Sequence, residues 1–254
     1  MFLSSHAIVL SKVRHTDSTF IATLYTEQAG SVAFAVRIPK TSRATIKPQL
    51  FQPLTLLTIE WDNREQQSLQ RLRNAHLLAP YTTLHTHPHK AAVSAFLAET
   101  LYHALHQENN GDIFSFIHHS LLWYDCPEGS FVSKSGYVAP KSGNVDNFPL
   151  IFLAQLTDHL GIGISAANGA PLPYFDLIEG EYTPTQPPHL YYLYGRDALF
   201  VHTLRRIAYP TLHLLRLTPA EQHRALRAIV AYYRIHIPDF PKLRSLDILR
   251  DLLS

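Results

Sequence analysis

The spacing of apolar residues changes near Pro80, and this change constrains the fold more than any other feature of the sequence. Before Pro80, short runs rich in β-branched and aromatic residues are separated by glycine- or proline-containing breaks, a pattern typical of β-strands. After Pro80, apolar residues recur every three or four positions, as they do on one face of a helix. The sequence therefore predicts an α+β chain with a β-barrel over residues 1–80 and a helical domain over residues 81–254.

Five strands are expected in the first segment, over residues 6–11, 18–26, 31–38, 51–61 and 69–77. Gly30 supplies a turn that joins the second and third strands into a hairpin, and prolines bound an exposed basic loop over residues 39–48. The last strand is imperfect, and its pattern is also compatible with a helix. Five short strands indicate a small barrel, either OB-fold-like or SH3-like, because periodicity does not distinguish these two folds.

Helices are expected in the second segment over residues 91–105, 112–124, 148–160, 197–207 and 219–237. The first carries one apolar stripe, formed by Val93, Phe96, Leu97, Leu101 and Leu105. Pro88 suits the start of this helix, and Gly161 suits the end of the third. Residues 126–147 form a long loop, and residues 166–189 form a proline-rich insertion that is irregular or contains a short β-element.

Positive charge is concentrated in the first segment. Residues 1–80 contain nine lysines and arginines against five acidic residues, a formal charge of +4, whereas the remainder carries −2 and the whole chain +2. Such asymmetry points to contact of the barrel with a polyanion such as a nucleic acid, or with a membrane surface.

Several classes of enzyme lack their signatures in this sequence. The single cysteine, Cys126, excludes an intramolecular disulfide and a four-cysteine zinc site. There is no phosphate-binding loop, nucleophile elbow or zinc-protease motif, and the glycines at 161 and 163 lack the third glycine of a dinucleotide fingerprint. The N-terminus does not resemble a signal peptide, and no apolar run is long enough to span a membrane. We therefore expect a non-enzymatic protein of the cytoplasm that needs no cofactor.

Three histidines at alternate positions, His85, His87 and His89, resemble a metal site, since imidazole binds zinc, copper and nickel. Thr86 and Pro88 place them in a loop, however, and no acidic residue is adjacent. We expect no metal there. A metal-dependent hydrolase built on this cluster is an alternative that elemental analysis would test.

Short segments match, in order along most of the chain, the pattern of one known family. They are residues 7–18 (AIVLSKVRHTDS), 25–30 (YTEQAG), 51–54 (FQPL), 96–99 (FLAE, after Lys90), 147–150 (NFPL), 160–161 (LG) and 174–177 (YFDL, before Gly180). Together they resemble the RecO family of recombination mediators. The last three resemble a form of that family common in Bacteroidetes.

The resemblance to RecO implies an N-terminal OB-fold, an all-helical C-terminal domain, and binding of single- and double-stranded DNA in the nucleoid. It also implies annealing of single strands, and loading of a RecA-type recombinase together with a RecR-like partner. RecO proteins dock the acidic, phenylalanine-ended tail of a single-stranded-DNA-binding protein on their helical domain. Many carry a four-cysteine zinc module, which is not carried over because this chain has one cysteine.

Candidate DNA-binding residues are the cations of the barrel, which can neutralise phosphates. They are Lys12, Arg14, Arg37, Lys40, Arg43, Lys47, Arg71 and Arg73, with Tyr25, Phe34 and Phe51 as candidates for stacking with bases. Candidates for docking the acidic tail are Arg205, Arg206, Arg224, Arg227 and Arg234. The alternative for both sets is ordinary solvent-exposed charge. The alternative function is an OB-fold adaptor for structured RNA or ribosomes.

Overall fold

The computed structural model describes residues 2–38, 46–64, 66–105, 110–126, 145–164 and 172–252. The chain divides into two compact units. Unit 1 contains Met1–Asp125 together with Leu243–Leu249, and unit 2 contains Cys126–Lys242 with Arg250–Ser254. The last barrel strand ends at Leu77, beside the domain boundary predicted at residue 80, but the two helices that follow belong by compactness to unit 1.

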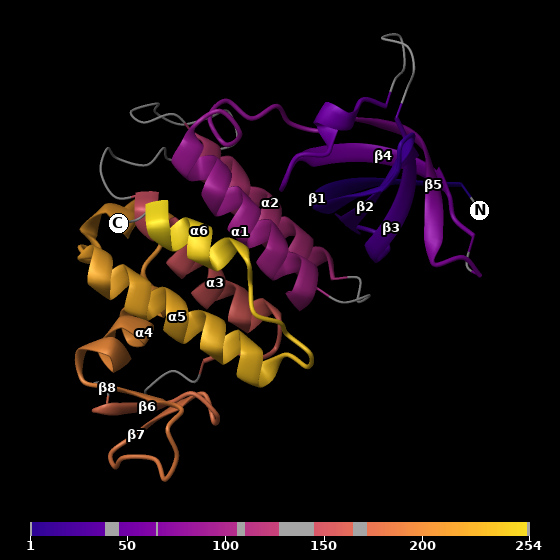
Figure 1. Cartoon of the computed structure of the whole chain (residues 1–254). Coiled ribbons are helices and arrows are strands. Elements are labelled where there is room, and N and C mark those ends of the chain that lie inside the picture. Colours follow the sequence, from indigo (N-terminus) through magenta and orange to yellow (C-terminus); the bar gives the residue numbers. More distant parts are fainter. Residues whose placement is uncertain are drawn as a thin grey trace. The chain divides into compact units, whose positions relative to one another are not determined.

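Unit 1 begins with a closed five-stranded barrel, at the indigo and purple end of the chain in Figure 1. Its strands are β1 (Phe2–Thr16), β2 (Thr19–Thr26), β3 (Gly30–Arg37), β4 (Leu56–Asp62) and β5 (Leu69–Leu77). Their order is β1-β2-β3-β5-β4, and β1 pairs with β4 to close the barrel. The β3–β5 pair is parallel and the other pairs are antiparallel. The predicted OB-fold-like barrel is confirmed, and residues 69–77 form a strand rather than a helix.

Aromatic side chains fill the barrel interior. Phe34 and Trp61 meet edge to face with ring centroids 5.7 Å apart, and Phe20 and Phe51 meet in the same way at 5.1 Å. All four side chains are buried in one cluster with aliphatic residues from every strand. Burial of this apolar surface holds the closed barrel together.

The fourth strand is shorter than the segment predicted for it, residues 51–61. A 3₁₀ turn, Pro48–Leu50, precedes this segment, and Leu54 adopts a positive φ of 62°. A non-glycine residue in that conformation interrupts an extended chain, so β4 begins only at Leu56. Gly30, with φ of 64°, confirms the predicted turn between β2 and β3, since glycine adopts this conformation without steric cost.

Two helices, α1 (Pro88–Ala104) and α2 (Gly111–Asp125), follow the barrel in unit 1. The buried Asp125 carboxylate accepts hydrogen bonds from three successive backbone N–H groups, those of Thr82, Thr83 and Leu84, at 2.7–2.8 Å. Lys90, also buried, donates to the Thr83 hydroxyl at 2.8 Å and to the Tyr124 carbonyl at 2.7 Å. We call this set of bonds the Asp125 clamp. It fastens the segment that leaves the barrel to the end of α2.

A C-terminal helix, α6 (Ser245–Leu252), is absent from the sequence prediction. Its N-terminus contacts Glu99 of α1, whose carboxylate accepts hydrogen bonds from the N–H groups of Arg244 at 3.0 Å and Ser245 at 2.8 Å, and from the Ser245 hydroxyl. Burial raises the pKa of Glu99, but these hydrogen bonds more than offset that effect, so its pKa lies below the usual value.

Replacing Glu99 by glutamine is expected to lower the free energy of unfolding by about 1–2 kcal/mol at neutral pH, because a charged acceptor is lost. The pKa of Glu99 is lower in the folded state than in the unfolded state. Its contribution is therefore complete above the unfolded pKa and disappears as the pH falls through the folded pKa. Denaturant unfolding of both proteins from neutral pH to about pH 3 measures this effect. A stability difference that stays constant over that range would contradict the expectation.

Within its described residues, unit 2 contains three α-helices close to their predicted positions, α3 (Phe148–His159), α4 (Arg196–Arg206) and α5 (Pro219–His236). Two 3₁₀ segments, Val145–Asn147 and Tyr209–Leu214, connect to them. Gly161, with φ of 73°, follows the end of α3 as predicted, since a left-handed residue terminates a helix.

A three-stranded antiparallel sheet begins in the proline-rich insertion of unit 2, and its last strand directly follows the insertion. Its strands are β6 (Tyr174–Asp176), β7 (Glu181–Thr183) and β8 (Tyr192–Tyr194), in the order β7-β6-β8. Phe175 is fully buried in a cluster with Tyr182 of the sheet and Tyr232 of α5. This sheet corresponds to the short β-element that the sequence offers as one alternative for the insertion, and one face of it supplies part of the core of unit 2.

Candidate nucleic-acid interface

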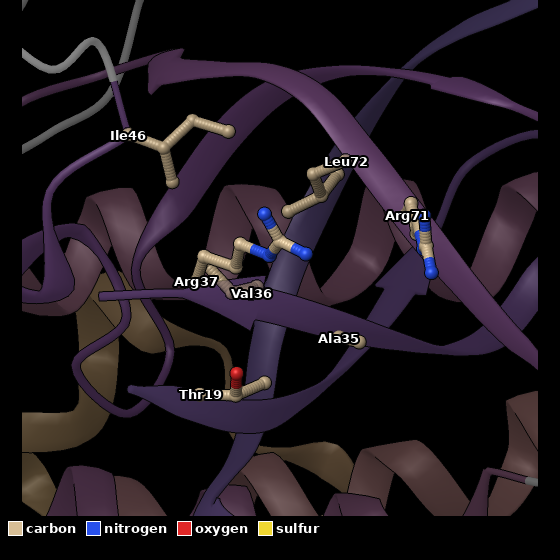
Figure 2. A pocket seen from close by; sticks show the side chains of 7 residues that line it. All are labelled: Thr19, Ala35, Val36, Arg37, Ile46, Arg71 and Leu72. Carbon is tan, nitrogen blue, oxygen red and sulfur yellow. The ribbon is translucent and has the colours of Figure 1, made fainter. Parts of the chain in front are cut away.

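Arg37 and Arg71 come together on the outer face of the barrel. In the parallel β3–β5 pair, Ala35 lies opposite Arg71, and strand alternation places Arg37 on the same side as Ala35. Both arginines line a hollow of about 470 Å³ with Thr19, Ala35, Val36, Ile46 and Leu72. Figure 2 shows the Arg37 side chain extending across this hollow, between Ile46 and Leu72 on one side and Thr19 and Ala35 on the other.

The charges of Arg37 and Arg71 are available to a ligand. Both residues are exposed, and within the described part of the chain neither forms an ion pair and no acidic residue lines the hollow. Arg73 follows two residues later on β5, but its guanidinium is 2.7 Å from the Asp62 carboxylate. The hollow is therefore a site where two arginines can bind a phosphate without first breaking an ion pair.

Lys12 and Arg14 lie on the other side of the sheet. They pair in register with Ala22 and Phe20, whose side chains are buried in the barrel. The Lys12 ammonium donates to the Pro48 carbonyl at 2.8 Å and lies 4.8 Å from the Phe20 ring centre, and burial lowers its pKa. Arg14 is exposed and bonds to Asp17 at 2.7 Å. The strand register thus places these two cations on the opposite face of the sheet from Arg37 and Arg71.

The basic loop of the prediction is described only in part. Lys47 is exposed and precedes the 3₁₀ turn Pro48–Leu50. Lys40 and Arg43 lie outside the described residues. Their role in DNA binding stays a prediction, as it does for the other cations.

The prediction that Tyr25, Phe34 and Phe51 stack with bases is wrong. Tyr25 and Phe34 are fully buried and Phe51 is 1% exposed, because all three pack in the core and their ring faces cannot reach a base. The sequence contained a signal for this, since Phe34 alternates with Ala33, Ala35 and Arg37 and so points to the opposite side from Arg37. Leu69 is 37% exposed and shares the outer face with Arg71, which makes it an apolar contact beside the hollow.

The arginines predicted to dock an acidic tail differ in their surroundings. Arg205 bonds to both oxygens of Asp158 at 3.2 Å, and Arg224 bonds to both oxygens of Asp197 at 3.1 Å. Arg206 lies 3.3 Å from a ring nitrogen of His202. Arg227 and Arg234 are exposed on α5. Two members of this set are therefore already neutralised by carboxylates, and the docking role of the set stays a prediction.

The histidines of the linker make contacts with the protein. His85 lies 2.9 Å from the Pro53 carbonyl, and His87 occupies the N-cap position of α1 without a side-chain capping hydrogen bond. No group of three His, Cys, Asp or Glu side chains that could hold a metal ion is found among the residues that the structure describes. Over the same residues, no helix is long and apolar enough to cross a membrane.

Comparison with known proteins gives one consistent result. Residues 1–81, which contain the whole barrel, match the family model described as "Recombination protein O N terminal". The full chain is similar to proteins named "DNA repair protein RecO" along the entire length of both sequences. Identity is 36% over 256 residues with that of Bacteroides fragilis, 33% over 255 residues with that of Phocaeicola vulgatus, and 25% over 256 residues with that of Flavobacterium psychrophilum.

Proposed function

Because this chain belongs to the RecO family of DNA repair proteins, we propose that it is a DNA-binding recombination mediator that works without covalent chemistry. It binds single- and double-stranded DNA through the barrel and anneals complementary single strands. With a RecR-like partner, it helps to load a RecA-type recombinase. The observation that carries this proposal is the hollow on the outer face of the barrel, where two arginines form no ion pair with any residue that the structure describes.

The geometry of the hollow suits a phosphate rather than a base. Two guanidinium groups offer planar sets of N–H donors that match phosphate oxygens, and such contacts do not depend on the base sequence. Ala35, Ile46 and Leu72 supply apolar walls on which a sugar or a base edge can pack. A surface of this kind binds any strand, as an annealing protein must.

Annealing follows from charge neutralisation. Two complementary strands repel each other through their phosphates, and cations that replace bound counterions reduce this repulsion. A strand held by its backbone keeps its bases free to pair with a second strand. The acidic tail of a single-stranded-DNA-binding protein, held by exposed arginines of unit 2 such as Arg227 and Arg234, would bring this chain to coated DNA.

The proposal is tested by fluorescence anisotropy with a labelled single-stranded oligonucleotide over a series of salt concentrations, followed by annealing of complementary oligonucleotides. We expect the logarithm of the affinity to fall linearly with the logarithm of the salt concentration. Each phosphate contact should add about 0.7 to the steepness of this slope. We also expect faster annealing than in the absence of protein. Competition with RNA of equal length separates this function from that of an RNA adaptor. Absence of binding at low salt would refute the proposal.

A further inference from the structure

The sheet of unit 2 has a second face that does not join the core. Phe175 lies opposite Tyr182 and Leu193, and these three side chains pack inward. By alternation, the other face carries two cross-strand rows. One row is Thr183, Tyr174 and Tyr194, and the other is Glu181, Asp176 and Tyr192. We call this face, with its three tyrosines and two acids, the tyrosine face.

The tyrosines form one group of rings with accessible surface. The ring centre of Tyr174 lies 4.9 Å from that of Tyr194 and 5.7 Å from that of Tyr192. Tyr194 is 63% exposed, and the chain just before β8 adds Leu190, which is 91% exposed, and Tyr191. A protein surface rarely gathers so many exposed apolar side chains unless another molecule covers them.

The charge around the tyrosine face is negative. No lysine or arginine occurs between residues 142 and 195, and of the five acidic residues in this stretch, Asp158 pairs with Arg205 and Asp176 lies 3.1 Å from a ring nitrogen of His189. Glu179 and Glu181 are exposed, and no ion pair involves them within the described residues. The first arginine after the stretch, Arg196, lies 3.0 Å from the Glu221 carboxylate. A DNA phosphate would therefore be repelled here, and a cation would be attracted.

We propose that the tyrosine face docks a basic, arginine-bearing segment of a partner protein. A guanidinium stacks on tyrosine rings, because their faces carry negative charge density, and its planar shape suits the group formed by Tyr174 and Tyr194. The Glu181 carboxylate, next to these rings across β6 and β7, then meets the positive charge. The exposed Leu190 packs against apolar side chains of the same segment.

The test uses the full chain and a short fluorescein-labelled peptide of alternating arginine and glycine, followed by anisotropy. A second peptide, in which citrulline replaces every arginine, keeps the planar shape and three of the five N–H donors of each side chain but removes the charge. We expect the arginine peptide to bind and the citrulline peptide not to bind. Tyr194→Leu and Glu181→Gln should each weaken binding of the arginine peptide about threefold. The matched control is Tyr102→Leu, at a tyrosine of α1 that is 42% exposed, and it should change nothing.

Four results would overturn the proposal. The first is that the citrulline peptide binds as tightly as the arginine peptide. The second is that Tyr194→Leu and Glu181→Gln both bind the arginine peptide as tightly as wild type does. The third is that these two variants lose affinity for single-stranded DNA. The fourth is self-association of the wild-type chain in sedimentation that Tyr194→Leu abolishes, since a second copy would then be the occupant. Circular dichroism of each variant shows whether it is folded. Because Glu181→Gln changes an exposed side chain by one atom, it keeps the test valid if Tyr194→Leu unfolds the sheet.

Discussion

Replacing Asp125 by alanine is expected to lower the free energy of unfolding of unit 1 by about 3 kcal/mol, which is a large part of the stability of a typical domain. The carboxylate of the Asp125 clamp accepts three successive backbone N–H groups, and alanine leaves them without an acceptor. The N–H of Leu84 belongs to a fully buried residue, so water cannot easily replace the lost bond. Thermal or denaturant unfolding, monitored by circular dichroism, measures the change.

Two further substitutions show whether the clamp causes this loss. Asp125→Asn keeps the oxygen that binds Thr83 and Leu84 but loses the one that binds Thr82, so its effect should lie between those of wild type and Asp125→Ala. Asp112→Ala removes an exposed carboxylate from the first turn of the same helix, and we expect a loss below about 1 kcal/mol. Equal losses at Asp125 and Asp112 would mean that the clamp contributes little.

The variant Arg37→Ala/Arg71→Ala is expected to bind single-stranded DNA roughly tenfold more weakly at low salt, because two charged donors to phosphate are lost. The salt dependence should change as well. Each lost phosphate contact lowers the slope of log affinity against log salt by about 0.7, so the double variant should lose about 1.4. Anisotropy over a salt series gives both quantities from one set of titrations.

Two control variants show whether weaker binding comes from loss of the hollow or from loss of positive charge in general. Arg216→Ala/Lys242→Ala removes two exposed positive charges from unit 2, so the net charge falls by the same amount. Asp62→Ala/Arg73→Ala removes an arginine that is already paired, without changing the net charge. Both should keep most of the affinity and of the slope. If either control weakens binding as much as the variant of the hollow, the hollow is not the main phosphate site.

Local patterns were sufficient to predict the five barrel strands and the helices α1 to α5. Alternation and three-to-four spacing are properties of neighbouring residues, and tertiary packing preserved them here. The meeting of Arg37 with Arg71 could not be predicted in this way. It depends on the parallel pairing that closes the barrel between β3 and β5, and no short segment encodes that pairing.

Long-range ion pairs and short helices account for most of what the sequence did not reveal. Arg205 and Asp158 are 47 residues apart, so a list of exposed-looking arginines cannot show that this one is neutralised. Helix α6 is short, and hydrogen bonds from the start of this helix to Glu99, 145 residues earlier in the sequence, help to attach it to unit 1. A window of a few residues cannot contain both partners of such a contact.

Unit 1 is assembled from both ends of the chain. During synthesis its barrel strands leave the ribosome early, whereas Leu243–Leu249 leave it only after Cys126–Lys242 of unit 2. Leu243 and Leu249 are fully buried, and the Glu99 carboxylate accepts hydrogen bonds from the backbone N–H groups of residues 244 and 245, which are made late in synthesis. A premature stop codon just before Leu243 would therefore damage the first unit to emerge, although it removes no barrel residue. Unit 1 is therefore complete in structure only after residues 243–249 have been translated.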